Sequence, residues 1–161
     1  MMEKVEVVDF NEAYADKVSA IITRNLFEVL KDDYTQDKLE HLASLFTPEK
    51  IIKLSIERKK MYVALSNGEP VGTLSVVNSW SKEDDAYVFL TIFVLPEYHK
   101  MGIGRKLINA GEDYIRSISG KKVDIPSSIT SHLFYNKLGY GYVNDNLEPD
   151  EQGCIPLTKR I

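Results

Sequence analysis

Residues 91–108 read Thr-Ile-Phe-Val-Leu-Pro-Glu-Tyr-His-Lys-Met-Gly-Ile-Gly-Arg-Lys-Leu-Ile, and this stretch decides the fold. It ends an apolar run that begins at Tyr87, crosses a polar turn with two glycines and opens an amphipathic segment. The first N–H groups of a helix lack internal partners and lie at the positive end of the helix dipole. Gly102 and Gly104 have no Cβ to hold a ligand away from such groups. The stretch therefore predicts a phosphate-binding turn between a buried strand and a helix.

The composition indicates one globular domain. The chain has 161 residues, of which 43% are hydrophobic and 27% charged, and its net charge is −4. The 20 basic residues are spread along the chain, so nucleic acid is not expected as a partner. No apolar run reaches the roughly 20 residues that span a bilayer, and the first residues lack the apolar core of a signal peptide. We therefore expect a cytoplasmic protein that does not contact membranes.

Cysteine and histidine usage predicts neither a disulfide nor a metal site. Cys154 is the single cysteine, so no internal disulfide can form. The three histidines, His41, His99 and His132, are scattered along the sequence. Such a set lacks the spacing of a metal-ligand cluster.

The N-terminal third is predicted to be mainly helical after one strand. Residues 3–10 alternate apolar and polar side chains, which predicts a strand. Asn11 caps a segment with helical apolar spacing that is expected to run to about residue 31. A second periodic segment covers residues 39–46, and Thr47-Pro48-Glu49 begins a helix expected to reach about residue 59.

The rest of the chain predicts a sheet with two further helices. Asn67-Gly68 joins two strands in a hairpin. The apolar strand that follows, at residues 87–95, lacks alternation and is expected to be central and buried on both faces. The further elements expected are a helix at 103–120, a strand at 123–125, a short helix at 130–138, and strands at 140–143 and 155–159. This order indicates an α+β fold with a mainly antiparallel sheet.

Two motifs resemble the Gcn5-related N-acetyltransferase (GNAT) family. The first is Val94-Leu-Pro-Glu-Tyr-His-Lys-Met-Gly-Ile-Gly104, and the second is Phe134-Tyr-Asn-Lys-Leu-Gly-Tyr140. The resemblance implies a single domain over residues 1–161 with an α+β fold of the three-layer α/β sandwich type. It also implies a mixed, mostly antiparallel twisted sheet flanked by helices, with a V-shaped splay between central strands that holds acetyl-CoA. The implied activity is an acetyl-CoA-dependent N-acetyltransferase, with no metal cofactor.

The resemblance assigns most of the first motif to the cofactor. Strand residues Ile92, Phe93 and Val94 are expected to pair with the pantetheine arm, and the N–H of Val94 is expected to stabilise the thioester oxygen as a catalytic group. The turn is expected to hold the pyrophosphate through the residues His99, Lys100, Met101, Gly102, Ile103, Gly104 and Arg105. His99 stands where the family usually has Arg or Gln, and Lys100 stands where glycine is common.

The second motif supplies the other catalytic residue. Tyr135 is expected to protonate the departing thiolate, because a phenol with a pKa of about 10 is protonated at neutral pH. Ser128, at a position where many members carry asparagine, and Asn136 are further candidates for cofactor contact. The helical segment of residues 11–59 is expected to wall the acceptor site.

Several alternatives stay open. The acidic residues 83–85 and Tyr87 precede or begin the central strand, but none is assignable as the general base. A non-catalytic acyl-CoA sensor or interaction module on the same fold is the rival function, whereas a Gly-x-Gly-x-x-Gly dinucleotide site is disfavoured because Leu107 stands where the last glycine would follow. The identity of the amine acceptor is not specified, and a homodimer is compatible with the family.

Overall fold

The computed structural model describes residues 4–81, 83, 85–145 and 147–161, and it is organised around one seven-stranded sheet. The strands are β1 (Val5–Asp9), β2 (Lys60–Ser66), β3 (Glu69–Asn78), β4 (Ala86–Val94), β5 (Lys122–Ser127), β6 (Gly141–Tyr142) and β7 (Ile155–Arg160). Their order is β1-β2-β3-β4-β5-β7-β6, and β4 and β5 form the parallel pair among antiparallel neighbours. The mixed, mostly antiparallel sheet with the apolar strand at its centre is thereby confirmed.

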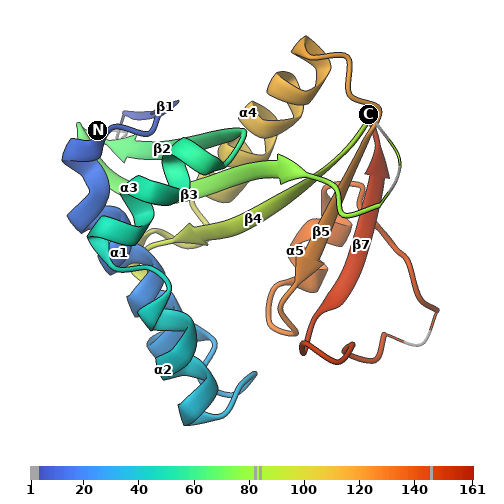
Figure 1. The fold of residues 1–161 in the computed structure, drawn as a ribbon, viewed down its shortest axis with the longest axis horizontal. Coiled ribbons are helices and arrows are strands. Elements are labelled where there is room, and N and C mark those ends of the chain that lie inside the picture. The colour runs from blue at the N-terminus through green and yellow to red at the C-terminus, as the bar shows by residue number, and fades with distance from the viewer. Residues whose placement is uncertain (1–3, 82, 84, 146) are drawn as a thin grey trace.

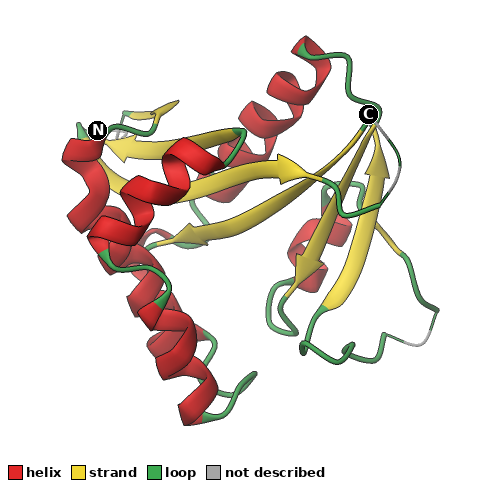
Figure 2. Ribbon diagram, in the orientation of Figure 1, coloured by secondary structure: helices red, strands yellow, loops and turns green. Residues whose placement is uncertain are grey.

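Helices cover both faces of this sheet (Figures 1 and 2). The helices are η1 (Glu12–Tyr14), α1 (Ala15–Arg24), η2 (Asn25–Val29), α2 (Gln36–Ser44), α3 (Pro48–Glu57), η3 (Pro96–Tyr98), α4 (Ile103–Ser117) and α5 (His132–Lys137). The first three α-helices share one core with one face of the sheet, and α4 and α5 share a second core with the other face. This gives the expected three layers. None of the helices in the described part of the chain is both long enough and apolar enough to cross a membrane.

One predicted helix is wrong in its form. The sequence predicts a single helix from Asn11 to about residue 31, whereas the structure has a 3-10 turn, α1 and then the π-helical turn η2. In η2 the Leu30 N–H donates to the Asn25 carbonyl oxygen at 2.9 Å, a spacing of five residues. The Asn25 side chain leaves this turn to bond the end of β4, a tertiary contact that the apolar period does not encode.

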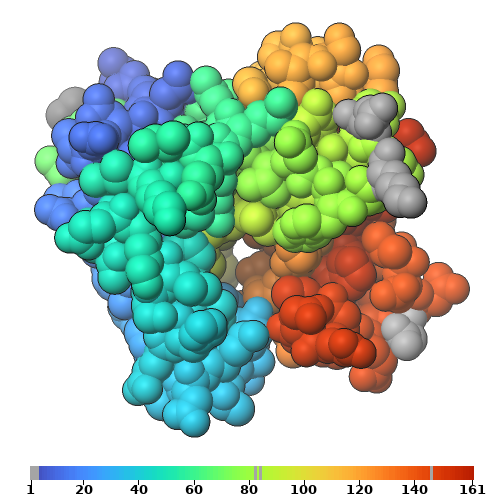
Figure 3. Space-filling model, viewed as in Figure 1, coloured from blue at the N-terminus to red at the C-terminus, as the bar shows by residue number. Residues whose placement is uncertain are grey.

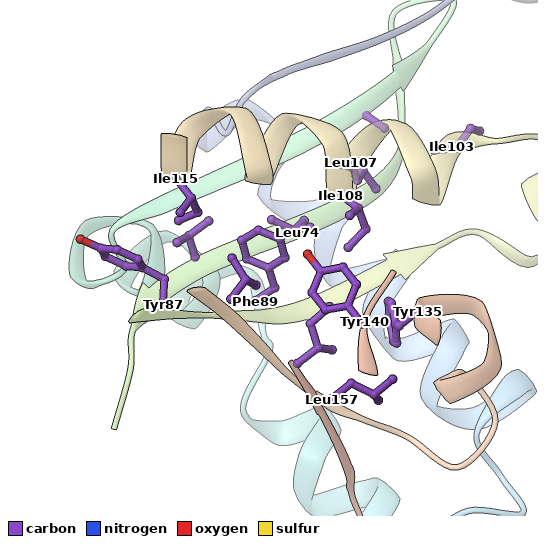
Figure 4. Close-up of a cluster of buried hydrophobic side chains, with 14 of the residues drawn as sticks. Leu74, Tyr87, Phe89, Ile103, Leu107, Ile108, Ile115, Tyr135, Tyr140 and Leu157 are labelled. Carbon is purple, nitrogen blue, oxygen red and sulfur yellow. The ribbon is translucent and has the colours of Figure 1, made fainter. Parts of the chain in front are cut away.

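The core under α4 fixes that helix against the sheet (Figure 4). Leu107, Ile108 and Ile115 are fully buried on its inner face. Gly111 lies so close to Phe89 that a Cβ there would be 2.7 Å from the Phe89 Cζ atom. A larger residue would have to displace the Phe89 ring or α4, the helix that begins at the glycine turn.

The strands β4 and β5 separate after a short paired segment. Their pairing covers Ala86–Val88 and Lys122–Asp124, and from there β4 continues to Val94 without β5. A bulge lies at Thr91, which has a positive φ of 48°, and the register of β3 and β4 shifts across it. Bulges bend a strand and increase its twist. The two strands diverge visibly in Figure 1, and this is the predicted V-shaped splay.

Candidate active site

A cavity of about 390 Å³ opens in the splay beside the end of β4. Figure 3 shows the molecular surface hollowed between the N-terminal helices and the C-terminal part of the chain. The residues predicted as site residues that line this cavity are Ile92, Phe93, Val94, His99, Lys100, Gly102, Ile103, Gly104 and Tyr135. The structure thus brings together the two motifs, which are some thirty residues apart in the sequence.

The N-terminus of α4 faces this cavity with free backbone donors. The first bond within the helix runs from the Lys106 N–H to the Gly102 carbonyl oxygen, so the N–H groups of residues 103–105 have no partner inside it. Helices α2 and α3 are capped by threonine side chains and carry an acid in the first turn. In the described residues α4 has neither feature. Such an end, with Lys100 beside it, suits an anionic ligand.

Gly102 permits the turn that starts this helix. Its φ is +81°, a left-handed conformation that side chains rarely adopt, and a Cβ there would meet nothing within 4 Å. Gly104, two residues on, is instead packed closely, because a Cβ there would lie 2.9 Å from the Phe134 ring. The Phe134 ring of the second motif thus packs against the turn of the first motif.

The backbone of Val94 is directed into the splay. The next residue, Leu95, donates its N–H to the Val71 carbonyl oxygen at 2.8 Å. In an antiparallel ladder neighbouring residues point their backbone groups to opposite edges, so the N–H and C=O of Val94 face away from β3. Its carbonyl oxygen accepts hydrogen bonds from Asn25 Nδ2 at 2.9 Å and from His99 Nε2 at 2.7 Å. The strand edge is therefore held in place by two side chains from other segments.

Tyr135 occupies the far wall of the cavity. Its side chain is buried, and burial raises its pKa above the ordinary value for tyrosine. The ring contacts Phe134 edge to face, with centroids 5.3 Å apart. The phenol is therefore fixed in position and protonated at neutral pH, as an acid that donates to a thiolate must be.

A second cavity of about 180 Å³ meets the first at Tyr135. It lies between η2, α2, β4 and β5, so residues of the helical segment 11–59 form part of its wall. The residues that line both cavities are Leu30, Ile92, Phe93, Ser131 and Tyr135. The protein thus has two adjoining chambers with the phenol at their junction.

The remaining residues predicted for the site do not line the first cavity. Met101, Arg105 and Asn136 do not contribute to the wall of either cavity as the described residues define it, and Asn136 donates through Nδ2 to the Tyr140 carbonyl oxygen at 3.0 Å. Ser128 lines the second cavity rather than the first and donates to Ser131 Oγ at 3.0 Å. In the described ranges no group of three or more metal-binding side chains is placed to hold an ion.

Sequence reasoning missed several residues of the first cavity. These are Asn25, Val29, Leu30, Tyr98, Thr130, Ser131 and Phe134. Phe134 stands inside the quoted second motif, so a signal for it existed. The sequence has no such signal for Asn25, because the periodic pattern of its helix predicts only which apolar side chains pack in the core.

Sequence comparison gives the family of this chain. The model of the acetyltransferase (GNAT) family matches residues 23–140, so the chain belongs to this family. The chain is also similar to an uncharacterized acetyltransferase in arcA 3′region of Streptococcus pyogenes. The two are 31% identical over 107 residues, which are 65% of this chain and 70% of the relative.

Solved structures agree on the fold. The PaiA N-acetyltransferase from Thermoplasma acidophilum in complex with coenzyme A superposes with a TM-score of 0.81 at 14% identity, covering 98% of this chain and 99% of that one. A GCN5-related N-acetyltransferase from Rhodopseudomonas palustris gives a TM-score of 0.78 at 20% identity, covering 100% of this chain and 99% of that one. A GNAT acetyltransferase from Brucella melitensis in complex with acetyl-CoA gives 0.69 at 15% identity, covering 99% and 90%.

Proposed function

We propose that the protein is an acetyl-CoA-dependent N-acetyltransferase that acts on a primary amine by direct attack in a ternary complex. The observation that carries this proposal is the junction of the two cavities at Tyr135, beside the edge of β4. One chamber suits an acyl donor and the other an acceptor, and they meet at the one phenol that both share. Proximity of two bound reactants supplies a large part of the rate in such reactions.

The first cavity offers partners to the phosphates and to the thioester of acetyl-CoA. The uncapped N-terminus of α4 offers backbone donors to the pyrophosphate, and Lys100 and His99 stand beside it. The edge of β4 at Val94 offers a backbone N–H to the acyl donor, whereas the Val94 carbonyl oxygen is already bonded by Asn25 and His99. Complexes of solved GNAT structures with coenzyme A and acetyl-CoA support the same assignment.

The chemical step needs little more than positioning. The amine nitrogen bonds to the acetyl carbonyl carbon, and the carbon–sulfur bond breaks. Tyr135 donates its phenolic proton to the departing sulfur, and the proton that the amine loses replaces it, so that the net transfer is from the amine to the sulfur. The Val94 N–H stabilises negative charge on the carbonyl oxygen. Asn25 and His99 fix the Val94 peptide for this task.

The test is thiol release from acetyl-CoA with a panel of primary amines, in the wild type and in Tyr135→Phe. A lost general acid lowers kcat by about 100-fold or more, while calorimetric affinity for acetyl-CoA stays within about twofold. Tyr62→Phe, at a partly buried position on β2 outside both cavities, is the control and should retain activity.

Two results would contradict the proposal. A folded wild type that does not bind acetyl-CoA would remove the cofactor assignment. Binding without thiol release for any amine would instead favour the non-catalytic sensor.

A further inference from the structure

The wall of the second cavity carries no charge to balance a cation. It consists mainly of leucine, isoleucine, phenylalanine and proline side chains, together with tyrosine, serine and threonine residues that bear hydroxyls. No acidic or basic side chain is part of that wall among the described residues. An ammonium group inside the cavity would therefore lose hydration without gaining a carboxylate partner, which is strongly unfavourable.

Hydroxyl groups of this wall already donate to other atoms of the protein. Thr91 donates to Ser75 Oγ at 3.0 Å. Ser127 donates to the Ser128 carbonyl oxygen at 2.8 Å, and the Ser128 hydroxyl donates to Ser131 Oγ at 3.0 Å. A hydroxyl whose proton is used in this way can still accept a hydrogen bond, but it supplies no negative charge. This part of the wall is therefore only weakly polar.

Two loops that pack around Tyr34 carry carboxylates, and both carboxylates are bonded elsewhere. Asp33 accepts hydrogen bonds from the Thr130 hydroxyl at 2.9 Å and from the Thr130 N–H at 3.0 Å. Asp150 accepts from two backbone N–H groups of its own loop, at 2.9 and 3.0 Å. Neither acid is part of the cavity wall. These bonds fasten the segments on the two sides of the hollow in Figure 3 and offer no charge to an occupant.

One phenol in the wall has no partner. The Tyr135 hydroxyl has no hydrogen bond to the described part of the chain, and burial raises its pKa with no bonded group contributing. The other phenol, that of Tyr34, interacts with Cys154, and its ring lies against Gly153. The second cavity thus offers a free polar contact at its junction with the first cavity and a mainly apolar surface beyond it.

The size of the cavity and its neighbour restrict the occupant further. A volume of about 180 Å³ lies below the range of drug-sized pockets, so the occupant is small. A longer polyamine would have to extend into the first cavity, where Lys100 and the positive end of the α4 dipole lie. Like charges would oppose it there.

We propose that the acetyl acceptor is a small apolar monoamine, with its aliphatic or aromatic body in the second cavity and its single amino group beside Tyr135. This inference rests on the proposed N-acetyltransferase function and names its substrate class. Diamines, polyamines, aminoglycosides and lysine peptides fall outside that class, because each brings further ammonium groups. The rival explanation is that the second cavity is only a packing gap and that the acceptor binds elsewhere.

The experiment compares each monoamine with a diamine of the same body. The pairs are butylamine with putrescine, pentylamine with cadaverine, and phenethylamine with its para-aminomethyl derivative, measured by thiol release from acetyl-CoA. The wild type is expected to favour at least one monoamine over its diamine by about tenfold or more in kcat/KM, because the second ammonium group has no partner in the cavity.

Two variants of α2 locate the acceptor. Leu42→Glu adds a carboxylate at a partly exposed position in the wall of the second cavity, and Leu45→Glu adds the same charge at an exposed position of the same helix end, outside both cavities. Leu42→Glu should raise the ratio of diamine to monoamine kcat/KM by about tenfold or more. Leu42→Gln, which has nearly the same shape without the charge, and Leu45→Glu should leave this ratio within about twofold of the wild type.

Thermal unfolding and calorimetric titration with acetyl-CoA accompany the kinetics of each variant. Leu42 does not line the first cavity, so all three variants should bind acetyl-CoA like the wild type. The comparison of substrate pairs in the wild type does not depend on the folding of any variant.

Three results would overturn the inference. Faster turnover of putrescine, spermidine, kanamycin or a lysine peptide than of every monoamine would refute the substrate class while leaving the N-acetyltransferase function intact. An unchanged ratio of diamine to monoamine in a folded Leu42→Glu variant would show that the acceptor does not occupy the second cavity. Acetyl-CoA binding without turnover of any amine would refute the proposed function as well, and calorimetry separates that case from a loss of cofactor binding.

Discussion

Gly102→Glu tests the phosphate-binding turn with a control that the chain itself provides. Gly102 has φ +81° and Gly68, in the β2–β3 hairpin, has φ +85°; a Cβ at either position meets nothing within 4 Å. Gly68→Glu therefore introduces the same side chain with the same backbone strain of about 1–2 kcal/mol. The two variants differ in their surroundings, because Gly102 lines the cavity at the N-terminus of α4.

The electrostatic effect at the turn follows from Coulomb's law. A carboxylate about 6 Å from a phosphate charge costs between about 0.7 kcal/mol in water and about 2.8 kcal/mol at an effective dielectric constant near 20. Each pair of charges therefore weakens binding of acetyl-CoA by about 3- to 100-fold. Gly102→Gln has nearly the same shape without the charge, so the difference between Glu and Gln isolates the charge. Salt at 0.5 M should reduce this difference by screening.

The assay is calorimetric titration with acetyl-CoA and with desulfo-CoA, beside thermal unfolding of every variant. We expect Gly102→Glu to bind acetyl-CoA more weakly than Gly102→Gln does. Gly68→Glu should bind acetyl-CoA like the wild type, and all three variants should have similar melting temperatures. Equal affinity for Gly102→Glu and Gly102→Gln would refute the reasoning, because the phosphates would then lie elsewhere. Equal weakening by Gly68→Glu would show that the loss comes from the fold.

Two further predictions concern stability. Glu112, buried on α4, accepts hydrogen bonds from the Tyr140 hydroxyl at 2.7 Å and from Lys159 Nζ at 3.0 Å. Glu112→Gln should therefore lower the free energy of unfolding, measured by urea titration, by about 2–3 kcal/mol. An unchanged urea midpoint would contradict this role of Glu112. Burial raises the pKa of Tyr34 to about 12, so the folded protein keeps a proton that the unfolded chain releases above pH of about 10. The free energy of unfolding should fall between about pH 10 and 12, and less steeply in Tyr34→Phe; identical slopes would rule this out.

The fold could be predicted well because its signals are local. An apolar strand, an Asn-Gly turn and a glycine pair before an amphipathic helix each specify their own structure, and the structure has all three where they were expected. The two motifs of the candidate site came instead from their resemblance to the GNAT family, and the structure brings both to one cavity. The form of the first helix could not, because the π turn at Asn25 depends on a bond to β4, at a separation of 69 residues.

The second cavity could not be predicted from the sequence, because it too depends on contacts between segments that are far apart in the chain. Its wall combines the end of η2, one face of α2, the middle of β4 and the end of β5, and in each of these segments the contributing residues are ordinary apolar or hydroxyl side chains. No periodic pattern distinguishes a leucine that lines a chamber from one that packs in a core. The chemical character of this cavity thus appears only when the segments are brought together.

Thr91 connects the fold to the proposed chemistry. A β-branched residue at φ 48° is strained, at a cost of about 1–3 kcal/mol, and such strain persists only where its surroundings enforce it. Here Arg58 donates to the Thr91 hydroxyl, which itself donates to Ser75 Oγ at 3.0 Å. Because a bulge bends its strand, these bonds stabilise the bend of β4 in the part that no longer pairs with β5. Lysine at position 58 can keep the bond to Thr91, so Arg58→Lys should preserve acetyl-CoA binding in calorimetric titration. Clearly weaker binding by this variant would contradict the bracing role of the bond.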